Sequence, residues 1–147
     1  MTIAAPLNPV DALKQHFPDA VLDVREFRGE TTVFVAPSEL QKVMQFLRDT
    51  SGLIYNYLSD ISAVDYWEQY GGIGDRPARF GVSYHLYSLL YNRRLRIKLY
   101  VDEDEPVVPT VTNVWPGANW LEREINDMMG IRFEGHPDMR RLLIVSC

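Results

Sequence analysis

The chain has 147 residues, of which 46% are hydrophobic, which is enough for one domain with its own core. Its net charge of −5 argues against a nucleic-acid binder, and no apolar run approaches the roughly 18 residues of a membrane-spanning helix. The only cysteine, Cys147, excludes an internal disulfide and any iron–sulfur or metal site built on several cysteines, and Met1–Asn8 lacks the basic residues of a signal peptide.

The N-terminal quarter predicts a short helix followed by a β-hairpin. Asn8 is a suitable N-cap, Pro9 fits the first helical position, and Pro18 ends the helix. Residues 20–27 and 31–36 have strand character, and a short turn containing glycine separates them. The two segments therefore predict antiparallel strands joined as a hairpin.

A second amphipathic helix and three further strands are expected in the middle of the chain. Ser38 and Gln41 form a capping-box pattern, apolar residues follow at helical spacing, and Gly52 closes the helix. Extended segments follow at 53–66, 80–91 and 95–101. The last of these alternates most clearly between apolar and polar residues, which indicates a half-exposed strand. Residues 69–79 contain three glycines and predict an exposed loop.

The order of these elements favours an α+β fold in which helices pack on a single mixed β-sheet. Residues 107–114 predict irregular or edge structure, because Pro109 cannot donate a hydrogen bond to a sheet. An extended C-terminal segment follows the last helix. We expect the domain to span residues 1–131 and this segment, a partner-binding tail, to span residues 132–147.

The last predicted helix, at residues 120–129, is densely charged. Asn119 and Glu122 have the spacing of a reciprocal cap, and Gly130 stands where a left-handed residue ends a helix. At about 100° per residue, the apolar stripe of this helix collects Leu121, Ile125, Met128 and Met129.

The same wheel separates two glutamates of the helix. Glu122 falls on the solvent side, whereas Glu124 falls on the shoulder of the apolar stripe. A partly buried carboxylate needs a cation, and Arg140 and Arg141 are the nearest candidates along the chain. We therefore expect Glu124→Ala to cost more stability than Glu122→Ala.

A tight turn at Gly135-His136-Pro137 follows the helix. Pro137 disfavours helical angles at His136, and Gly135 permits a conformation that other residues resist. The turn is expected to present Phe133 and His136 at a fixed place, with Phe133 as an anchor for a partner. One histidine cannot build a catalytic or metal site alone, so a turn-fixing or interface role is favoured for His136.

The order of residue types in this region resembles the signature of one known family. The shared positions are Glu122, Arg123, Glu124, Asp127, Gly130, Ile131, Phe133, Gly135, His136, Pro137, Arg140, Arg141 and Leu142. The family is that of the hydrophilic C subunit (30 kDa type) of respiratory complex I, the proton-pumping NADH:quinone oxidoreductase. In that family the chain usually continues past the Arg-Arg-Leu motif, whereas this sequence stops at Cys147, so we expect a partner-binding tail that is naturally short or truncated.

The resemblance implies a non-catalytic structural subunit of the peripheral arm. Such a subunit packs against the large quinone-pocket subunit and supports electron transfer from NADH to quinone. It carries no cofactor of its own, because flavin, iron–sulfur clusters and quinone lie on partner subunits. It is expected on the cytoplasmic, inner face of the energy-coupling membrane, held there through its complex.

Other functions stay open on the residues alone. A similar domain occurs in membrane-bound hydrogenases and in photosynthetic NDH-type complexes. A small free-standing hydrolase would use Glu124, Asp127 and His136 in one pocket. A generic protein-binding module unrelated to respiration is the third alternative.

Overall fold

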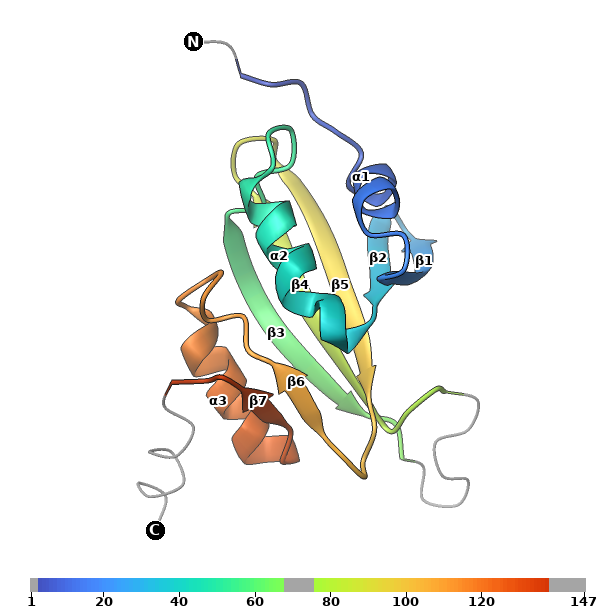
Figure 1. Ribbon diagram of the computed structural model, residues 1–147, viewed down its shortest axis with the longest axis vertical. Helices are drawn as coiled ribbons and strands as arrows, with labels where there is room; N and C mark the ends of the chain where they lie inside the picture. Colours follow the sequence, from blue (N-terminus) through green and yellow to red (C-terminus); the bar gives the residue numbers. More distant parts are fainter. Residues whose placement is uncertain (1–2, 68–75, 138–147) are drawn as a thin grey trace.

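The protein was analysed as a computed structural model, which describes residues 3–67 and 76–137. In these ranges the elements in chain order are α1 (Pro9–His16), β1 (Val21–Phe27), β2 (Glu30–Val35), the 3₁₀ turn η1 (Pro37–Glu39), α2 (Leu40–Asp49), β3 (Tyr57–Asp65), β4 (Phe80–Ser88), β5 (Arg93–Val101), β6 (Val107–Pro109), α3 (Ala118–Met129) and β7 (Arg132–Glu134). Figure 1 labels the helices and strands on a ribbon coloured from the N-terminus to the C-terminus.

A mixed five-stranded sheet in the order β1-β2-β5-β4-β3 forms the centre of the fold. Only β2 and β5 pair in parallel, and the other three pairs are antiparallel. The α+β fold with a mixed sheet and packed helices, expected from the sequence, is confirmed. A second sheet was not expected: β6 and β7 pair in parallel as a separate two-stranded unit.

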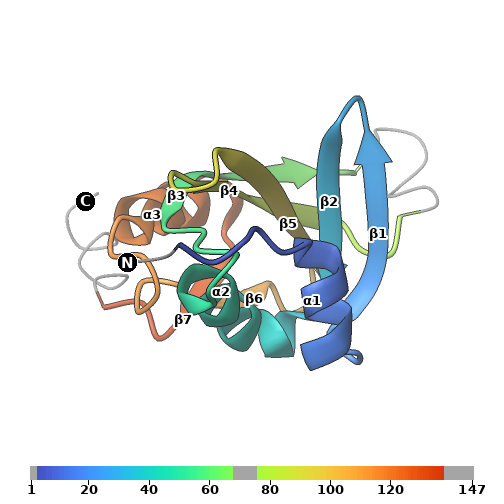
Figure 2. The same ribbon diagram turned by 90° about the horizontal axis from the view of Figure 1, so that it is seen from above.

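One face of the large sheet is covered by α1, α2 and the β6–β7 pair, and α3 packs along β3 (Figure 2). The apolar stripe of α2 is fully buried there through Leu40, Val43, Met44 and Leu47. It meets the inward residues of β5, which are Leu95, Ile97, Leu99 and Val101. Each such side chain contributes about 1.5–3 kcal/mol when it leaves water, so this layer holds the domain together.

The local signals near the N-terminus are confirmed. The Asn8 side chain accepts hydrogen bonds from the backbone N–H groups of Val10 and Asp11, at 2.9 and 3.2 Å. The β1–β2 hairpin turns through Arg28 and Gly29, both with positive φ. A turn residue without a Cβ suits that conformation, which explains the glycine.

The capping box expected at the start of α2 is wrong. Ser38 lies inside η1, and α2 begins after Glu39 without a side-chain cap. The Gln41 side chain instead donates to the backbone oxygen of Thr110, 2.7 Å away. The local pattern assigned the Gln41 side chain to the start of α2, but its hydrogen-bond acceptor lies 69 residues further along the chain.

The expected boundary between domain and tail falls inside the folded part. Residues 132–134 form β7, which pairs with β6 from Val107 to Pro109. The remaining expected tail, 138–147 with Arg140 and Arg141, lies outside the described residues, as do residues 68–75 of the expected loop. In the described ranges, no helix is both long and apolar enough to cross a membrane.

Candidate functional site

The helix α3 starts two residues earlier than expected and ends as expected. Its N-cap is Gly117, so Asn119 lies within the first turn and forms no reciprocal cap with Glu122. Gly130 takes the left-handed conformation with φ 73°, and its N–H donates to Asn126 O at 2.9 Å. The Asn126 side chain then donates to Ile131 O at 3.0 Å, which fixes the exit of the chain from the helix.

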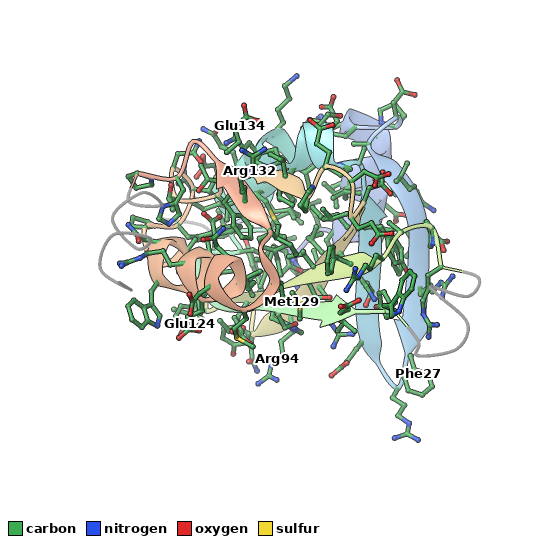
Figure 3. All side chains as sticks on the ribbon, turned by 90° about the horizontal axis from the view of Figure 1, so that it is seen from below. Phe27, Arg94, Glu124, Met129, Arg132 and Glu134 are labelled. Carbon is green, nitrogen blue, oxygen red and sulfur yellow. The ribbon has the colours of Figure 1, made fainter. Side chains whose placement is uncertain are left out.

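The two glutamates of α3 exchange the places expected for them. Glu122 is 0% exposed, whereas Glu124 is exposed at the surface of the helix (Figure 3). The inner face runs through Ala118, Leu121, Glu122, Ile125 and Met129. Ala118, Ile125 and Met129 lie at the centre of the buried stripe, which places Glu122 inside its edge and leaves Met128 78% exposed. The expectation of a buried Glu124 was therefore wrong.

Glu122 is held by hydrogen bonds rather than by a cation. Its Oε1 accepts from the Thr110 hydroxyl at 2.5 Å, and its Oε2 accepts from Val111 N–H at 2.8 Å. No ion pair to Glu122 occurs within residues 3–67 and 76–137. Burial raises the pKa of this carboxyl to about 7, against the lowering effect of the two bonds.

Tyr84 on β4 is the second buried polar group of this region. Its ring is fully buried, and its hydroxyl has no hydrogen-bond partner among the described residues. Burial raises its pKa well above the ordinary tyrosine value, and the nearby charge of Glu122 raises it further. Burial therefore favours the neutral form of Tyr84 and, below about pH 7, the neutral form of Glu122.

Thr110 connects α3 to the rest of the domain. Besides donating to Glu122, it donates its N–H to Glu134 O at 2.9 Å and accepts the Gln41 side chain on its own oxygen. A Cβ placed on Gly135 would lie 3.2 Å from the Thr110 methyl group, and Gly135 has φ 86°. Glycine is therefore required there both for its conformation and for the close approach of Thr110.

The turn after β7 is tied back to the start of α3. The His136 ring nitrogen Nε2 lies 3.0 Å from Asn119 O, and the His136 N–H donates to Phe133 O at 3.1 Å. These contacts support the turn-fixing role expected for His136, which stays a prediction. Phe133 differs from expectation: it is 3% exposed and belongs to the core, so it is no anchor for a partner.

The arrangement does not assemble the hydrolase site considered from the sequence. His136 lies against Asn119 in the first turn of α3, whereas Asp127 is two turns further along, about 12 Å at 1.5 Å per residue. Glu124 and Asp127 are both exposed on the helix surface. Within the described ranges, no group of three or more His, Cys, Asp or Glu residues is placed to hold a metal ion.

The outer face of α3 carries three signature residues, Arg123, Glu124 and Asp127, between Trp120 and Met128. Trp120 is 61% exposed, and the Arg123 guanidinium lies over its ring, 5.5 Å from the centroid. The Arg123 Nε atom is buried and has no hydrogen-bond partner in the described part of the chain. Glu124, Asp127 and Met128 are exposed beside this pair. We call these five residues the α3 outer face.

Sequence reasoning overlooked Trp120 and Thr110. Trp120 precedes the motif by two residues, and its exposure follows only from the true rotation of the helix. Thr110 sits in a segment without periodicity, so nothing local marks it as the partner of Glu122. Ala118 was the available signal, because it shares one helix face with Glu122 and Ile125.

Comparison of the sequence with known proteins gives a consistent result. The family described as "Respiratory-chain NADH dehydrogenase, 30 Kd subunit" matches residues 33–146. The C subunit of the NADH-quinone oxidoreductase of Geobacter sulfurreducens is 46% identical over 134 residues, covering 91% of this chain and 78% of that protein. The protein of the same name from Roseiflexus sp. is 44% identical over 135 residues, covering 92% and 74%.

Solved structures agree with the sequence relatives. A structure described as Nqo5 of a trypsin-resistant fragment superposes with a TM-score of 0.75 at 31% identity, covering 89% of this chain and 99% of that one. A chain of an archaeal membrane-bound sulfane sulfur reductase superposes with a TM-score of 0.70 at 21% identity, covering 88% and 71%, and shares the fold. On these matches, the chain belongs to the respiratory-chain NADH dehydrogenase 30 kDa subunit family, whose curated members include the C subunits of NADH-quinone oxidoreductases.

Proposed function

We propose that this protein is a structural subunit of an NADH:quinone oxidoreductase of the complex I type. It would join the peripheral arm by binding other subunits, chiefly the large quinone-pocket subunit, on the cytoplasmic side of the membrane. Its role would be to hold that subunit in place during electron transfer from NADH to quinone. Flavin, iron–sulfur clusters and quinone would be bound by the partners and not by this chain.

The observation that carries this proposal is the α3 outer face. The inner face of α3 is held in place by the hydrogen bonds of Glu122 and by the contact of His136 with Asn119 O. The helix therefore presents Trp120 and Arg123 on a rigid support. Exposed Trp and Arg side chains are the types that dominate binding energy at protein interfaces. The Arg123 guanidinium, held over the Trp120 ring, has further N–H donors besides its buried Nε that a partner can accept from.

The test compares two matched Trp–Arg pairs in the tagged full-length chain, expressed in its own host. Trp120 with Arg123 is the proposed interface pair; Trp67 with Arg79 is the control, with a similar separation of 5.4 Å and 52% exposure at Trp67. Trp120→Ala should reduce co-purification of the other subunits at least about tenfold, as expected of a hot-spot residue. Trp67→Ala should leave it nearly unchanged.

Two further readouts make the result decisive. The melting temperature of each isolated variant shows whether the fold survives, and NADH:quinone activity of host membranes shows whether the loss of assembly matters. Equal co-purification of both Trp variants would contradict the role proposed for the α3 outer face. Purification of the unchanged chain without any respiratory subunit would contradict the proposed function itself.

A further inference from the structure

The large sheet has a second face that no described helix covers. Figure 2 shows α1, α2, β6 and β7 on one side of the sheet and open space on the other. Along β5, apolar residues point toward the helices, whereas Arg94, Arg96, Lys98 and Tyr100 alternate onto the open side. In Figure 3, Arg94 and Phe27 project from the side opposite to Arg132 and Glu134 of β7.

This open side is concave rather than flat. The β1–β2 hairpin rises past the other strands and forms a wall along it (Figure 2). Two recesses flank the middle of the face. One has a volume of about 530 Å³ and is lined by Glu30, Asp60, His85, Arg94 and Arg96, among others. The other has a volume of about 370 Å³ and is lined by Leu22, Arg25, Phe34 and Tyr100, among others. We call the whole concave face the back trough.

The back trough carries four cations against three carboxylates on a chain whose net charge is −5; the carboxylates are Asp23, Glu30 and Asp60. Two of its cations are paired within the chain: Arg96 with Glu30 at 3.0 Å, and Arg25 with Asp23 at 3.2 Å. Neither Arg94 nor Lys98 has a carboxylate within ion-pair distance among residues 3–67 and 76–137. These two cations are the ones left for an external anion.

Aromatic rings hold both of these cations in place. The Lys98 ammonium lies 5.1 to 5.8 Å from the ring centroids of Phe34, Tyr66 and Tyr100, and it donates to the Tyr66 hydroxyl. The Arg94 guanidinium lies 5.8 Å from the Tyr87 ring centroid. A side chain already restrained by such contacts loses less entropy when it binds, which favours a specific partner.

The chemistry of the face selects the kind of partner. Arg94 and Lys98 are four residues apart on one strand, about 13 Å, which two side chains of an extended peptide can span. The apolar recess beside Phe34 and Tyr100 suits an apolar side chain of the same segment. The net charge of −5 argues against a nucleic acid as the partner, and the separate cations Arg94 and Lys98 fit two single carboxylates.

We propose that the back trough docks an acidic segment of a different polypeptide, whose carboxylates pair with Arg94 and Lys98. The contact is separate from the α3 outer face and does not depend on which complex the chain enters. It would give the protein two binding faces, one on α3 and one on the large sheet.

The composition of the chain allows a direct test with a zero-length carbodiimide cross-linker, which joins lysine to carboxylate. The sequence has three lysines, Lys14, Lys42 and Lys98, and of these only Lys98 lies on the back trough. In host cells expressing the tagged full chain, mass spectrometry should find Lys98 joined to an Asp or Glu of another protein. Lys98→Arg should remove this product and still allow assembly, because the charge is kept.

Two charge-reversal variants measure how much the back trough contributes to partner binding. Arg94→Glu should reduce recovery of the cross-linked protein roughly tenfold relative to Lys42→Glu, which changes the charge equally on exposed α2. Melting temperatures of both isolated variants control for folding, and Arg94→Gln serves if the reversal unfolds the chain. Absence of a Lys98 product, a product only with a second copy of this chain, or equal recovery with both variants would overturn the proposal.

Discussion

Glu122 shows how one residue can link a signature motif to stability rather than to chemistry. Its carboxyl is fully buried, accepts bonds from Thr110 and Val111, and has a pKa raised to about 7 by burial. The unfolded chain would release the same proton near 4.5. The folded protein therefore holds the proton more tightly than the unfolded one, so the stabilising contribution is complete below about pH 4.5 and is lost as pH rises through about 7.

We predict that Glu122→Gln removes this part of the pH dependence. A difference in pKa from 4.5 to about 7 corresponds to about 3 kcal/mol, so the free energy of unfolding of the parent should fall by roughly this amount relative to the variant between pH 4 and 8. The glutamine oxygen can accept from Val111 N–H, and its amide can donate to the Thr110 hydroxyl. Denaturant titrations at several pH values measure the difference.

Glu124→Gln is the control for that experiment. It lies on the same helix but is exposed, so its substitution should change stability by less than about 0.5 kcal/mol at every pH. If the free energy of unfolding changed equally with pH in the parent and in Glu122→Gln, the buried carboxyl would not titrate between pH 4 and 8.

At the scale of elements, the two glycines that border α3 have opposite requirements. Gly130 ends the helix with φ 73°, whereas Gly117 precedes it with φ −63° and ψ −16°, angles that any residue adopts. A Cβ at either position would meet no heavy atom within 4 Å. The two glycines therefore differ only in the backbone conformation that each position requires.

We predict that Gly130→Ala destabilises the domain by about 1–2 kcal/mol, the cost of a left-handed residue with a Cβ. Gly117→Ala should be neutral or stabilise by about 0.4–1 kcal/mol, because it restricts the unfolded chain without strain. Thermal and denaturant unfolding of the two variants, side by side, gives the answer. Equal effects would mean that α3 does not end at Gly130 in solution.

Elements with a local cause were predictable from sequence. The Asn8 cap, the hairpin glycine, the alternating strand β5 and the Gly130 stop each follow from residues within a few positions. The β6–β7 sheet was not predictable, because its strands are three residues long and are separated by α3. The pairing exists only once the turn at His136 and the Thr110 contact have brought them together.

The candidate site was predictable as a region but not in its orientation. The motif from Glu122 to Pro137 covers α3 and the turn after β7, but its buried and exposed members were partly interchanged. A hydrophobicity wheel places a glutamate only by the apolar residues around it, and it does not include Thr110 and Val111, 12 and 11 residues upstream, whose hydrogen bonds satisfy the buried Glu122. Long-range hydrogen bonds decided both this case and that of Gln41.

At the scale of the whole molecule, the described residues after α3 complete the core. Ile131 and Phe133 are 0% and 3% exposed, and β7 closes the small sheet. The described fold ends at Pro137, and residues 138–147 contain Arg140 and Arg141 of the motif. The two parts can be separated by truncation.

We predict that a chain ending at Pro137 keeps its fold, whereas a chain ending at Gly130 loses it. Removing the buried Ile131 and Phe133 side chains costs about 2–5 kcal/mol each, a large share of the roughly 5–15 kcal/mol that holds a domain folded. If the Arg140–Arg141 segment binds the large arm subunit, the longer truncation product should melt like the parent yet co-purify less of that partner. Melting followed by circular dichroism, together with co-purification from the host, tests both points. A Pro137 product that is unfolded would make residues 138–147 part of the core, and one that assembles normally would remove them from the interface.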